Sequence, residues 1–259
     1  MDLQIAARSA LVFGGSKGMG YAAARQLALE GVQVVIAART ESTLQGASAH
    51  LSQECGLQVR HVVADITTEA GRLAALHACP APDILVTNGD GFAPGDFHDW
   101  DSAVWHRALD MMMVGPIEMI RLVVDGMRAR RYGRIINIVS RSVKAPHAEL
   151  GLSNGARSGL VGFCAGLARQ TIRDNVTINN VLPGAFDTDA QTRHLEKLAL
   201  GQGKTMAQIR ESKQALNPAG RFGRPEEVGA LIAYLSSNHA GYVNGQSWLI
   251  DGGEYPGVF

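Results

Sequence analysis

The sequence predicts an α/β fold: a doubly wound domain with a seven-stranded parallel sheet and helices on both faces. Short apolar runs alternate with longer amphipathic stretches along the whole chain of 259 residues. The runs are apolar on both faces, which is typical of parallel strands that helices cover on both sides. No proline- or serine-rich linker, internal repeat or low-complexity tract divides the chain. We therefore expect a single domain over residues 1–259.

The short apolar runs are the predicted strands, in the order Ser9–Phe13, Gln33–Ala38, Gln58–Val63, Asp83–Thr87, Arg134–Val139, Thr177–Val181 and Ser247–Ile250. The amphipathic stretches between them are the predicted helices, at about Met19–Glu30, Ser42–Glu54, Glu69–His77, Val104–Arg130, Leu152–Arg173 and Pro225–Leu235. One stretch, from Thr188 to Gly220, has no strand-like run. Its polarity and its internal glycines predict a helical flap over the substrate rather than core.

Composition and charge narrow the possible classes of function. Lys plus Arg and Asp plus Glu both total 24, so the net charge is zero and neither nucleic acid nor a membrane is an expected partner. The cysteines, Cys55, Cys79 and Cys164, are far apart, so neither a metal site nor a disulfide framework is predicted. The N-terminus lacks the apolar run of a signal peptide, and no stretch approaches the ~20 apolar residues of a membrane span. We expect a soluble, cytoplasmic protein.

A glycine-rich loop joins the first predicted strand to the first predicted helix. Its glycines let the turn tighten and bring backbone N–H groups and the helix N-terminus against a pyrophosphate. The strand–loop–helix context makes this motif far stronger evidence than glycines alone. The alternative is a glycine-rich turn with only a packing role. The residues expected to bind a dinucleotide here are Gly14, Ser16, Lys17, Gly18, Met19 and Gly20.

The end of the second predicted strand favours NADP(H) over NAD(H). A site that prefers NAD has Asp or Glu about 20 residues after the glycine loop, to hold the ribose 2′-hydroxyl. Here the positions read Ala37-Ala38-Arg39, and the guanidinium of Arg39 suits a 2′-phosphate. Lys17 can add a second positive charge. The alternative is a pair of solvated surface cations.

Further motifs follow the later strands. They are Asp65 after the third, Asn88 after the fourth, Asn137-Ile-Val-Ser140 at the end of the fifth, Pro183-Gly184 after the sixth, then Arg221-Phe-Gly-Arg-Pro225-Glu-Glu and Gly245-Gln246…Asp251-Gly252-Gly253. Together with the glycine loop, they resemble the short-chain dehydrogenases/reductases nearly from end to end, in the same order and spacing. The resemblance implies a Rossmann-type fold and a nicotinamide cofactor.

The resemblance also implies positions around the cofactor. Asp65 and Ile66 are expected beside the adenine, and Asn88 and Gly89 near the ribose. The loop expected beside the carboxamide contains Pro183, Gly184, Phe186 and Thr188. The family forms dimers and tetramers, which implies a homo-oligomer built through the two long helices and the C-terminal strand. Glycines that would allow close helix approach are Gly155, Gly159, Gly162 and Gly166.

The catalytic half departs from the family's pattern of Asn, Ser, Tyr and Lys. The serine matches Ser140, but Ser153 stands in place of the tyrosine and Arg157 in place of the lysine. The asparagine position is Met112, within a methionine run that is expected to pack as core or to line a pocket. The chain thus resembles a divergent branch of the family, with Leu-Ser-Asn-x-Ala-Arg in place of the tyrosine motif.

These substitutions change the available chemistry. The family's tyrosine donates a proton, with its pKa lowered by the lysine, whereas a serine hydroxyl is a far weaker acid. A guanidinium stays protonated at any working pH, so Arg157 cannot shuttle protons. Arg157 can instead hold the nicotinamide ribose or stabilise an oxyanion. Ser140 can hydrogen-bond a substrate oxygen.

A replacement proton donor is expected between Ser140 and the long helix that follows it. Lys144 and His147 are candidates, and Asp90 could act as a base if burial raised its pKa. Each has a structural alternative: a surface lysine, a loop histidine and a turn at Asp90-Gly91; Ser153 could simply cap a helix. The catalytic residues we expect are Ser140, Ser153, Arg157 and Lys144.

Three functions are compatible with these residues. The favoured one is an NADP(H)-dependent oxidoreductase acting on a small carbonyl or alcohol, in which Ser140 and Arg157 polarise the oxygen. The second is a non-redox lyase, dehydratase or isomerase that retains the nucleotide as a structural group. The third is a catalytically silent protein that binds NADPH.

Overall fold

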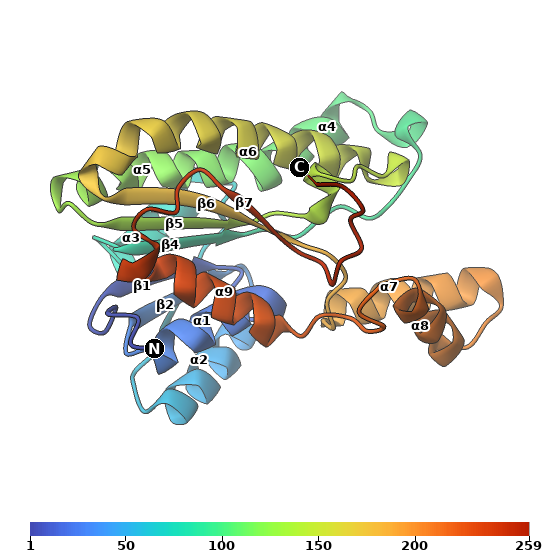
Figure 1. The fold of residues 1–259 in the computed structure, drawn as a ribbon, viewed down its shortest axis with the longest axis horizontal. Coiled ribbons are helices and arrows are strands. Elements are labelled where there is room, and N and C mark those ends of the chain that lie inside the picture. Colours follow the sequence, from blue (N-terminus) through green and yellow to red (C-terminus); the bar gives the residue numbers. More distant parts are fainter. Residues whose placement is uncertain (259) are drawn as a thin grey trace.

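The predicted fold class is confirmed in the computed structural model, which describes residues 1–258 (Figure 1). Seven parallel strands form one sheet in the order β3-β2-β1-β4-β5-β6-β7. The strands are β1 Ser9–Phe13, β2 Gln33–Ala38, β3 Arg60–Val63, β4 Ile84–Asn88, β5 Gly133–Ile138, β6 Val176–Pro183 and β7 Ser247–Ile250. The predicted bounds of β1, β2 and β7 match those observed.

Helices cover both faces of this sheet. They are α1 Gly18–Leu29, α2 Glu41–Cys55, α3 Glu69–Ala78, α4 Ser102–Leu109, α5 Gly115–Ala129, α6 Gly151–Thr171, α7 Asp189–Gln202, α8 Met206–Ala215 and α9 Pro225–Ser236. In Figure 1, α1, α2 and α9 lie on one side of the sheet, and α5 and α6 on the other. Helices on both faces bury every strand except those at the sheet edges.

The central strand β1 divides its side chains between two cores. Ala10 and Val12 belong to the cluster that includes residues of α1, α2 and α9. Leu11 and Phe13 belong to the cluster that includes residues of α3, α5 and α6. Successive side chains of a strand point to opposite faces, so an apolar run without alternation serves both layers.

The long helix predicted over Val104–Arg130 is interrupted. It forms α4, then a π-helical turn over Asp110–Val114, then α5. Pro116 has no N–H to donate to the carbonyl oxygen one turn earlier, which favours a widened turn before it. Within the turn Met112 is buried, as expected for core, whereas Met111 lines the cavity described below.

The stretch Thr188 to Gly220 is helical, as predicted, and its two helices α7 and α8 project beyond one end of the sheet (Figure 1). Leu195 of α7, Ile209 of α8 and Phe222 form a small apolar cluster of their own. The two helices therefore pack mainly on each other.

Two glycines of α6 have a packing role within the chain, which differs from the expected role between subunits. A Cβ atom on Gly155 would lie 3.1 Å from the Trp105 ring, and one on Gly159 would lie 2.5 Å from the sulfur of Met113. By contrast, Gly162 and Gly166 face open space. Trp105 also meets Trp100 edge to face, so both tryptophans are packing residues.

A polar ladder crosses the sheet near the carboxyl ends of its middle strands. Thr87 of β4 donates to Asn137 of β5 at 2.6 Å, and Asn137 donates to Asn180 of β6 at 3.0 Å. All three side chains are buried, so each bond also satisfies a group that would be costly to leave unpaired. The ladder fixes the register of the strand ends that carry the site. No helix within residues 1–258 is long and apolar enough to cross a membrane.

Candidate active site

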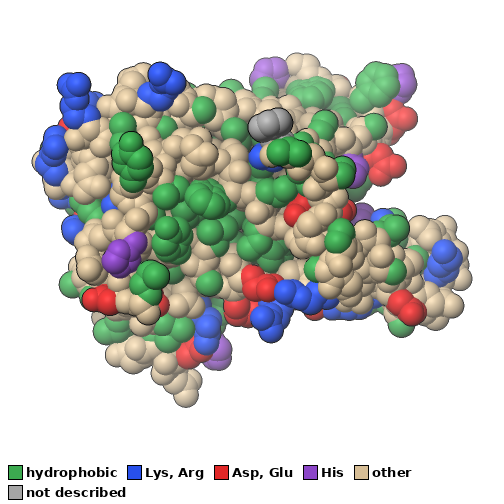
Figure 2. Space-filling model, viewed as in Figure 1, with side chains coloured by type: hydrophobic (Ala, Val, Ile, Leu, Met, Phe, Trp, Pro, Cys, Tyr) green, Lys and Arg blue, Asp and Glu red, His purple; other side chains and the backbone are tan. Residues whose placement is uncertain are grey.

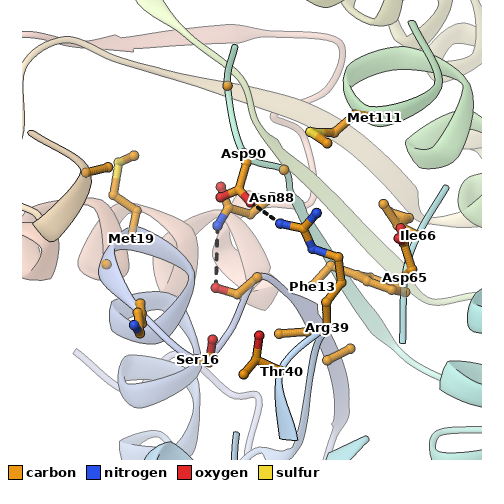
Figure 3. Close-up of a pocket in the computed structure, with 18 of the residues that line it drawn as sticks. Phe13, Ser16, Met19, Arg39, Thr40, Asp65, Ile66, Asn88, Asp90 and Met111 are labelled. Atoms are coloured by element: carbon orange, nitrogen blue, oxygen red, sulfur yellow. Dashed lines mark hydrogen bonds and ion pairs between the residues drawn. The ribbon is translucent and has the colours of Figure 1, made fainter. Parts of the chain in front are cut away.

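A cavity of about 400 Å³ opens at the carboxyl ends of β1, β2 and β4 and beyond β3 and β5 (Figure 3). The strand order reverses there, because β1 has β2 on one side and β4 on the other. Such a switch point leaves a crevice in which doubly wound sheets bind their ligands. The cavity is lined by most of the residues predicted to bind the cofactor: Gly14, Ser16, Lys17, Gly18, Met19, Arg39, Asp65, Ile66, Asn88, Gly89, Arg157 and Thr188.

The glycine loop fits closely against the end of β4. Gly14 has a φ of +64°, a conformation that side chains other than glycine rarely adopt. A Cβ atom on Gly20 would lie 2.3 Å from the carbonyl oxygen of Gly14. The Asn88 side-chain nitrogen donates to the same carbonyl oxygen at 3.5 Å. The loop is thus held to β4 by close backbone contact that a side chain would prevent.

The first turn of α1 suits an anion. No side chain caps its N-terminus, and no acidic residue lies in its first turn. Its backbone N–H groups and the positive end of the helix dipole therefore face the cavity without a protein counter-charge. Lys17, at the N-cap position, is exposed. These features fit the pyrophosphate of a dinucleotide.

The Arg39 guanidinium, expected to face a 2′-phosphate, is already paired. Its Nη2 donates to the carboxylate of Asp90, which follows β4 (Figure 3). Both side chains are exposed, 55% for Arg39 and 72% for Asp90. Arg39 is therefore exposed but not a free surface cation, and Asp90 does more than form a turn, because the two side chains pair with each other.

The loop after β3 is ordered by Asp65. Its carboxylate accepts hydrogen bonds from the backbone and hydroxyl of Thr67, at 2.9 and 2.8 Å. The carbonyl oxygen of the next residue, Ile66, accepts a hydrogen bond of 2.8 Å from Arg72 Nη1. Asp65 and Ile66 both line the cavity wall, on the side of Arg39 (Figure 3).

Arg157 is buried at the inner wall of the cavity, 7% exposed. Its Nη1 donates to the carbonyl oxygens of Ile138 and Val139 at 3.2 and 3.0 Å. Its Nη2 lies 3.4 Å from the carbonyl oxygen of Gly89. Burial lowers the pKa of Arg157 to about 10, and the Asp90 carboxylate acts in the opposite direction. The guanidinium therefore remains charged at neutral pH.

Ser153 is buried four residues before Arg157 in α6, and its hydroxyl oxygen accepts from Arg157 Nε at 3.1 Å. The alternative that Ser153 caps this helix is wrong. The helix begins at Gly151, and its N-cap position is Leu150, without a side-chain hydrogen bond.

Ser140 lies directly after Val139, whose carbonyl oxygen Arg157 contacts. Its Oγ accepts from the backbone N–H of Ser142 at 3.1 Å, so the hydroxyl proton remains available to a ligand. The fold thus brings Ser140, Ser153 and Arg157 together near the end of β5. Neither Ser140 nor Ser153 is among the residues that line the 400 Å³ cavity.

Lys144 and His147 lie on the loop that joins β5 to α6, and neither lines the cavity. His147 Nε2 is 3.2 Å from Nη2 of Arg141. Since arginine only donates hydrogen bonds, Nε2 accepts and carries no proton in this arrangement. Arg141 also pairs with Glu254 of the C-terminal segment at 2.8 Å.

Four residues predicted beside the cofactor do not line the cavity: Gly20, Pro183, Gly184 and Phe186. Gly20 packs against Gly14, as described above. Pro183 ends β6, and a Cβ atom on Gly184 would lie 2.7 Å from Asp251. Phe186 is buried against Gly223.

The flap was expected over the substrate, but beyond Thr188 none of its cavity residues was predicted from the sequence. Asp189, Ala190 and Arg193 of α7 line the cavity, next to Thr188. The spacing of Asp189 and Arg193, one helical turn apart, places them on one face and was the available signal. No group of three or more His, Cys, Asp or Glu side chains within residues 1–258 could hold a metal ion.

Comparisons with known proteins agree with this geometry. A family model described as enoyl-(acyl carrier protein) reductase matches residues 14–254. The 3-oxoacyl-[acyl-carrier-protein] reductase of Vibrio cholerae is 30% identical over 255 residues, which cover 98% of this chain and 99% of that protein.

Solved structures are similar over the full length. L-sorbose reductase from Gluconobacter frateurii, complexed with NADPH and L-sorbose, has a TM-score of 0.95 and 28% identity, covering 100% of both chains. A variant of the actinorhodin polyketide ketoreductase with NADPH has a TM-score of 0.89 and 27% identity, over 96% of this chain and 97% of that one. The chain therefore belongs to the short-chain dehydrogenase/reductase superfamily, and it is an oxidoreductase of that superfamily, whose members use NAD(P)H.

Proposed function

We propose that this protein is an NADP(H)-dependent oxidoreductase that interconverts a small carbonyl compound and its alcohol at a non-standard catalytic centre. The observation that carries the proposal is Arg157, a buried cation that lines the cofactor cavity and contacts the residue before Ser140. Two similar proteins are named for 3-oxoacyl and L-sorbose reduction, and the latter was solved with NADPH. Both names describe the reduction of a ketone, which supports a carbonyl substrate here.

The cofactor supplies a hydride when it is bound, and residues of the chain are assigned to each of its parts. The glycine loop and the first turn of α1 suit the pyrophosphate, and Arg39 with Lys17 suits the 2′-phosphate. Asp65 and Ile66 are assigned to the adenine, and Asn88 and Gly89 to the ribose. The loop assigned to the carboxamide runs over Pro183, Gly184, Phe186 and Thr188.

The hydrogen bonds of Arg157 leave it one donor to offer. A guanidinium has five N–H groups. Nε–H is directed to Ser153, both Nη1 hydrogens to Ile138 and Val139, and one Nη2 hydrogen to Gly89. The second Nη2 hydrogen is uncommitted among the described residues, at a group that lines the cavity. We assign it to the nicotinamide ribose or to the developing oxyanion.

The Ser140 hydroxyl is assigned to the substrate oxygen. Its oxygen already accepts from the backbone of Ser142, which orients it and leaves its proton to donate. Donation to a carbonyl oxygen makes the carbon a better hydride acceptor and stabilises the alkoxide that forms. Ser153 holds Arg157 in place and is a positioning residue in this assignment.

Reduction of a carbonyl requires one proton in addition to the hydride. Of the two candidates after Ser140, His147 is engaged at Nε2 by Arg141. Lys144 is half-buried on the same loop and has no ion pair among the described residues. We assign the proton to Lys144, which passes it to the alkoxide oxygen and is reprotonated from solvent. Lys144→Met should then lower kcat and change its pH profile.

Deuterium transfer tests the reaction type. NADPH that carries deuterium at its transferable position is mixed with the protein and a panel of small ketones and aldehydes. We expect deuterium on the alcohol carbon of the product and an equal loss of reduced-nicotinamide absorbance. Product formed without net cofactor oxidation would instead indicate a lyase, dehydratase or isomerase. Tight NADPH binding with no turnover across the panel would indicate a silent binding protein.

We also propose that residues 1–259 act as one domain and assemble as a homo-oligomer. All four residues of the edge strand β7 are only half-buried, and Tyr242 is 98% exposed. Figure 2 shows apolar side chains gathered over the middle of this face, where Figure 1 draws β7. Gly162 and Gly166 leave the outer face of α6 open to close approach. A monomeric mass in solution would reject the assembly.

A further inference from the structure

The ion pair of Arg39 with Asp90 spans two walls of the cofactor cavity. Arg39 follows β2, and Asp90 follows β4, with the glycine loop after β1 between these strands. Both residues line the cavity, and Figure 3 shows the Arg39 side chain extending across it to the Asp90 carboxylate. A cation assigned to the 2′-phosphate is therefore engaged by a carboxylate of the chain itself.

Asp90 also lies close to the second arginine of the site. The residue directly before it, Gly89, has its carbonyl oxygen 3.4 Å from Arg157 Nη2. The Asp90 charge acts on Arg157 as well, since it opposes the loss of the Arg157 proton on burial. Asp90 is thus an acid placed between an exposed arginine and a buried arginine of one cavity.

We propose that Asp90 is a cofactor-specificity residue: it holds Arg39 in the empty protein, and the 2′-phosphate of NADP(H) displaces it from Arg39. The inference rests on NADP(H) as the cofactor proposed above. Binding exchanges one anion for another at Arg39, so Asp90 weakens the affinity for 2′-phosphorylated nucleotides. A nucleotide without this phosphate leaves the ion pair in place and gains nothing from Arg39.

The charges favour the exchange. A phosphate monoester carries about −1.5 to −2 charges at neutral pH, more than the single charge of a carboxylate, and offers three acceptor oxygens to a guanidinium. An ion pair between two exposed side chains stabilises only weakly, because water screens both charges. The phosphate can therefore replace Asp90, at a cost in affinity that removal of the carboxylate should recover.

Fragment binding to four proteins tests the competition. Adenosine 2′,5′-bisphosphate and 5′-AMP are titrated by calorimetry into the unmodified protein, Asp90→Asn, Arg39→Met and the double variant. We expect Asp90→Asn to bind the bisphosphate about two- to fivefold more tightly, the range of one exposed ion pair. Its affinity for 5′-AMP should not change. In the Arg39→Met background, Asp90→Asn should have no effect on either ligand.

The control is Asp99→Asn, which removes one negative charge from an exposed position on the same loop and should leave both affinities unchanged. An equal gain in both backgrounds would mean long-range repulsion of the phosphate, and would overturn the proposal. An equal gain for 5′-AMP would mean simple obstruction of the cavity, and would overturn it too. If Asp90→Asn bound the bisphosphate no more tightly than the unmodified protein, the proposal would also be overturned. No binding of the bisphosphate to the unmodified protein would reject NADP(H) itself.

Discussion

The Nε atom of Arg157 donates to the hydroxyl oxygen of Ser153 at 3.1 Å, between positions one helical turn apart in α6. Both side chains are buried. They are the two residues expected from the sequence in place of the family's lysine and tyrosine. The serine therefore satisfies a donor of a buried cation. We therefore propose that Ser153 positions Arg157 and takes no part in proton transfer.

Ser153→Ala should show this positioning role. The change leaves the buried Nε–H of Arg157 without its partner, which costs about 1–3 kcal/mol. We expect a lower melting temperature and a weaker affinity for NADPH, with no change in the shape of the pH profile of kcat. Ser158→Ala, at an exposed position of the same helix, is the control. A displaced pH profile in Ser153→Ala would show that the hydroxyl takes part in proton transfer.

Arg157→Ala should lower kcat by about 10²–10³, the range found when a donor to a developing oxyanion is removed. It also leaves the carbonyl oxygens of Ile138 and Val139 without their donor. Arg157→Lys should recover part of the rate, because an ammonium keeps the charge but not the planar geometry. Burial brings the pKa of Arg157 to about 10, so this group should cause no loss of activity between pH 6 and about 9. Steady-state rates over that pH range test both statements.

Arg39→Met should reduce cofactor discrimination. In the unmodified protein, NADPH at about 100 times its dissociation constant stabilises the fold by ~2.7 kcal/mol, which gives a readily measured rise in melting temperature. At the same concentration the variant should show a smaller rise with NADPH and an unchanged response to NADH. Arg60→Met is the control. It removes an exposed arginine from the first residue of β3, at the end of the strand away from the cavity. If both variants respond alike, Arg39 does not bind the 2′-phosphate.

Glu227 should make stability depend on acid pH. Hydrogen bonds from Arg221 and from the backbone N–H of Arg224 lower the pKa of Glu227 from 4.5 to about 2. Because the folded-state pKa is lowered, the stabilisation is complete above pH 4.5 and is lost as the pH falls towards 2. Glu227→Gln should melt at a lower temperature than the unmodified protein at pH 7. The difference should shrink below pH 4.5, and a difference that stays constant would contradict this role.

The sequence predicts most of the strands, because the local pattern of apolar and turn residues sets where a strand begins and ends. The apolar runs of β1, β2 and β7 end where turn residues begin, so their bounds match. The glycine loop is equally readable, since Gly14 needs a positive φ and Gly20 meets a backbone oxygen. These requirements fall on residues next to one another in the chain.

The features that the sequence analysis missed depend on the packed chain. The π-helical turn before Gly115 has a local cause in Pro116. The helical pattern of apolar residues nevertheless runs on through this turn, so the sequence predicts one unbroken helix. The pairing of Arg39 with Asp90 joins residues 51 positions apart, and periodicity carries no information on such contacts. The same holds for Arg193, which lines the cavity although it lies in the flap, far from the other lining residues in the sequence.

The catalytic assignment of Ser140 and Arg157 is tested most directly by the rate of carbonyl-dependent NADPH oxidation in three proteins. These are the unmodified protein, Ser140→Ala and Arg157→Ala, each compared after NADPH affinity has been measured. With saturating NADPH, we expect both variants to lose about 10²-fold or more in kcat. Turnover that is unchanged in either variant would contradict the catalytic assignment of that residue.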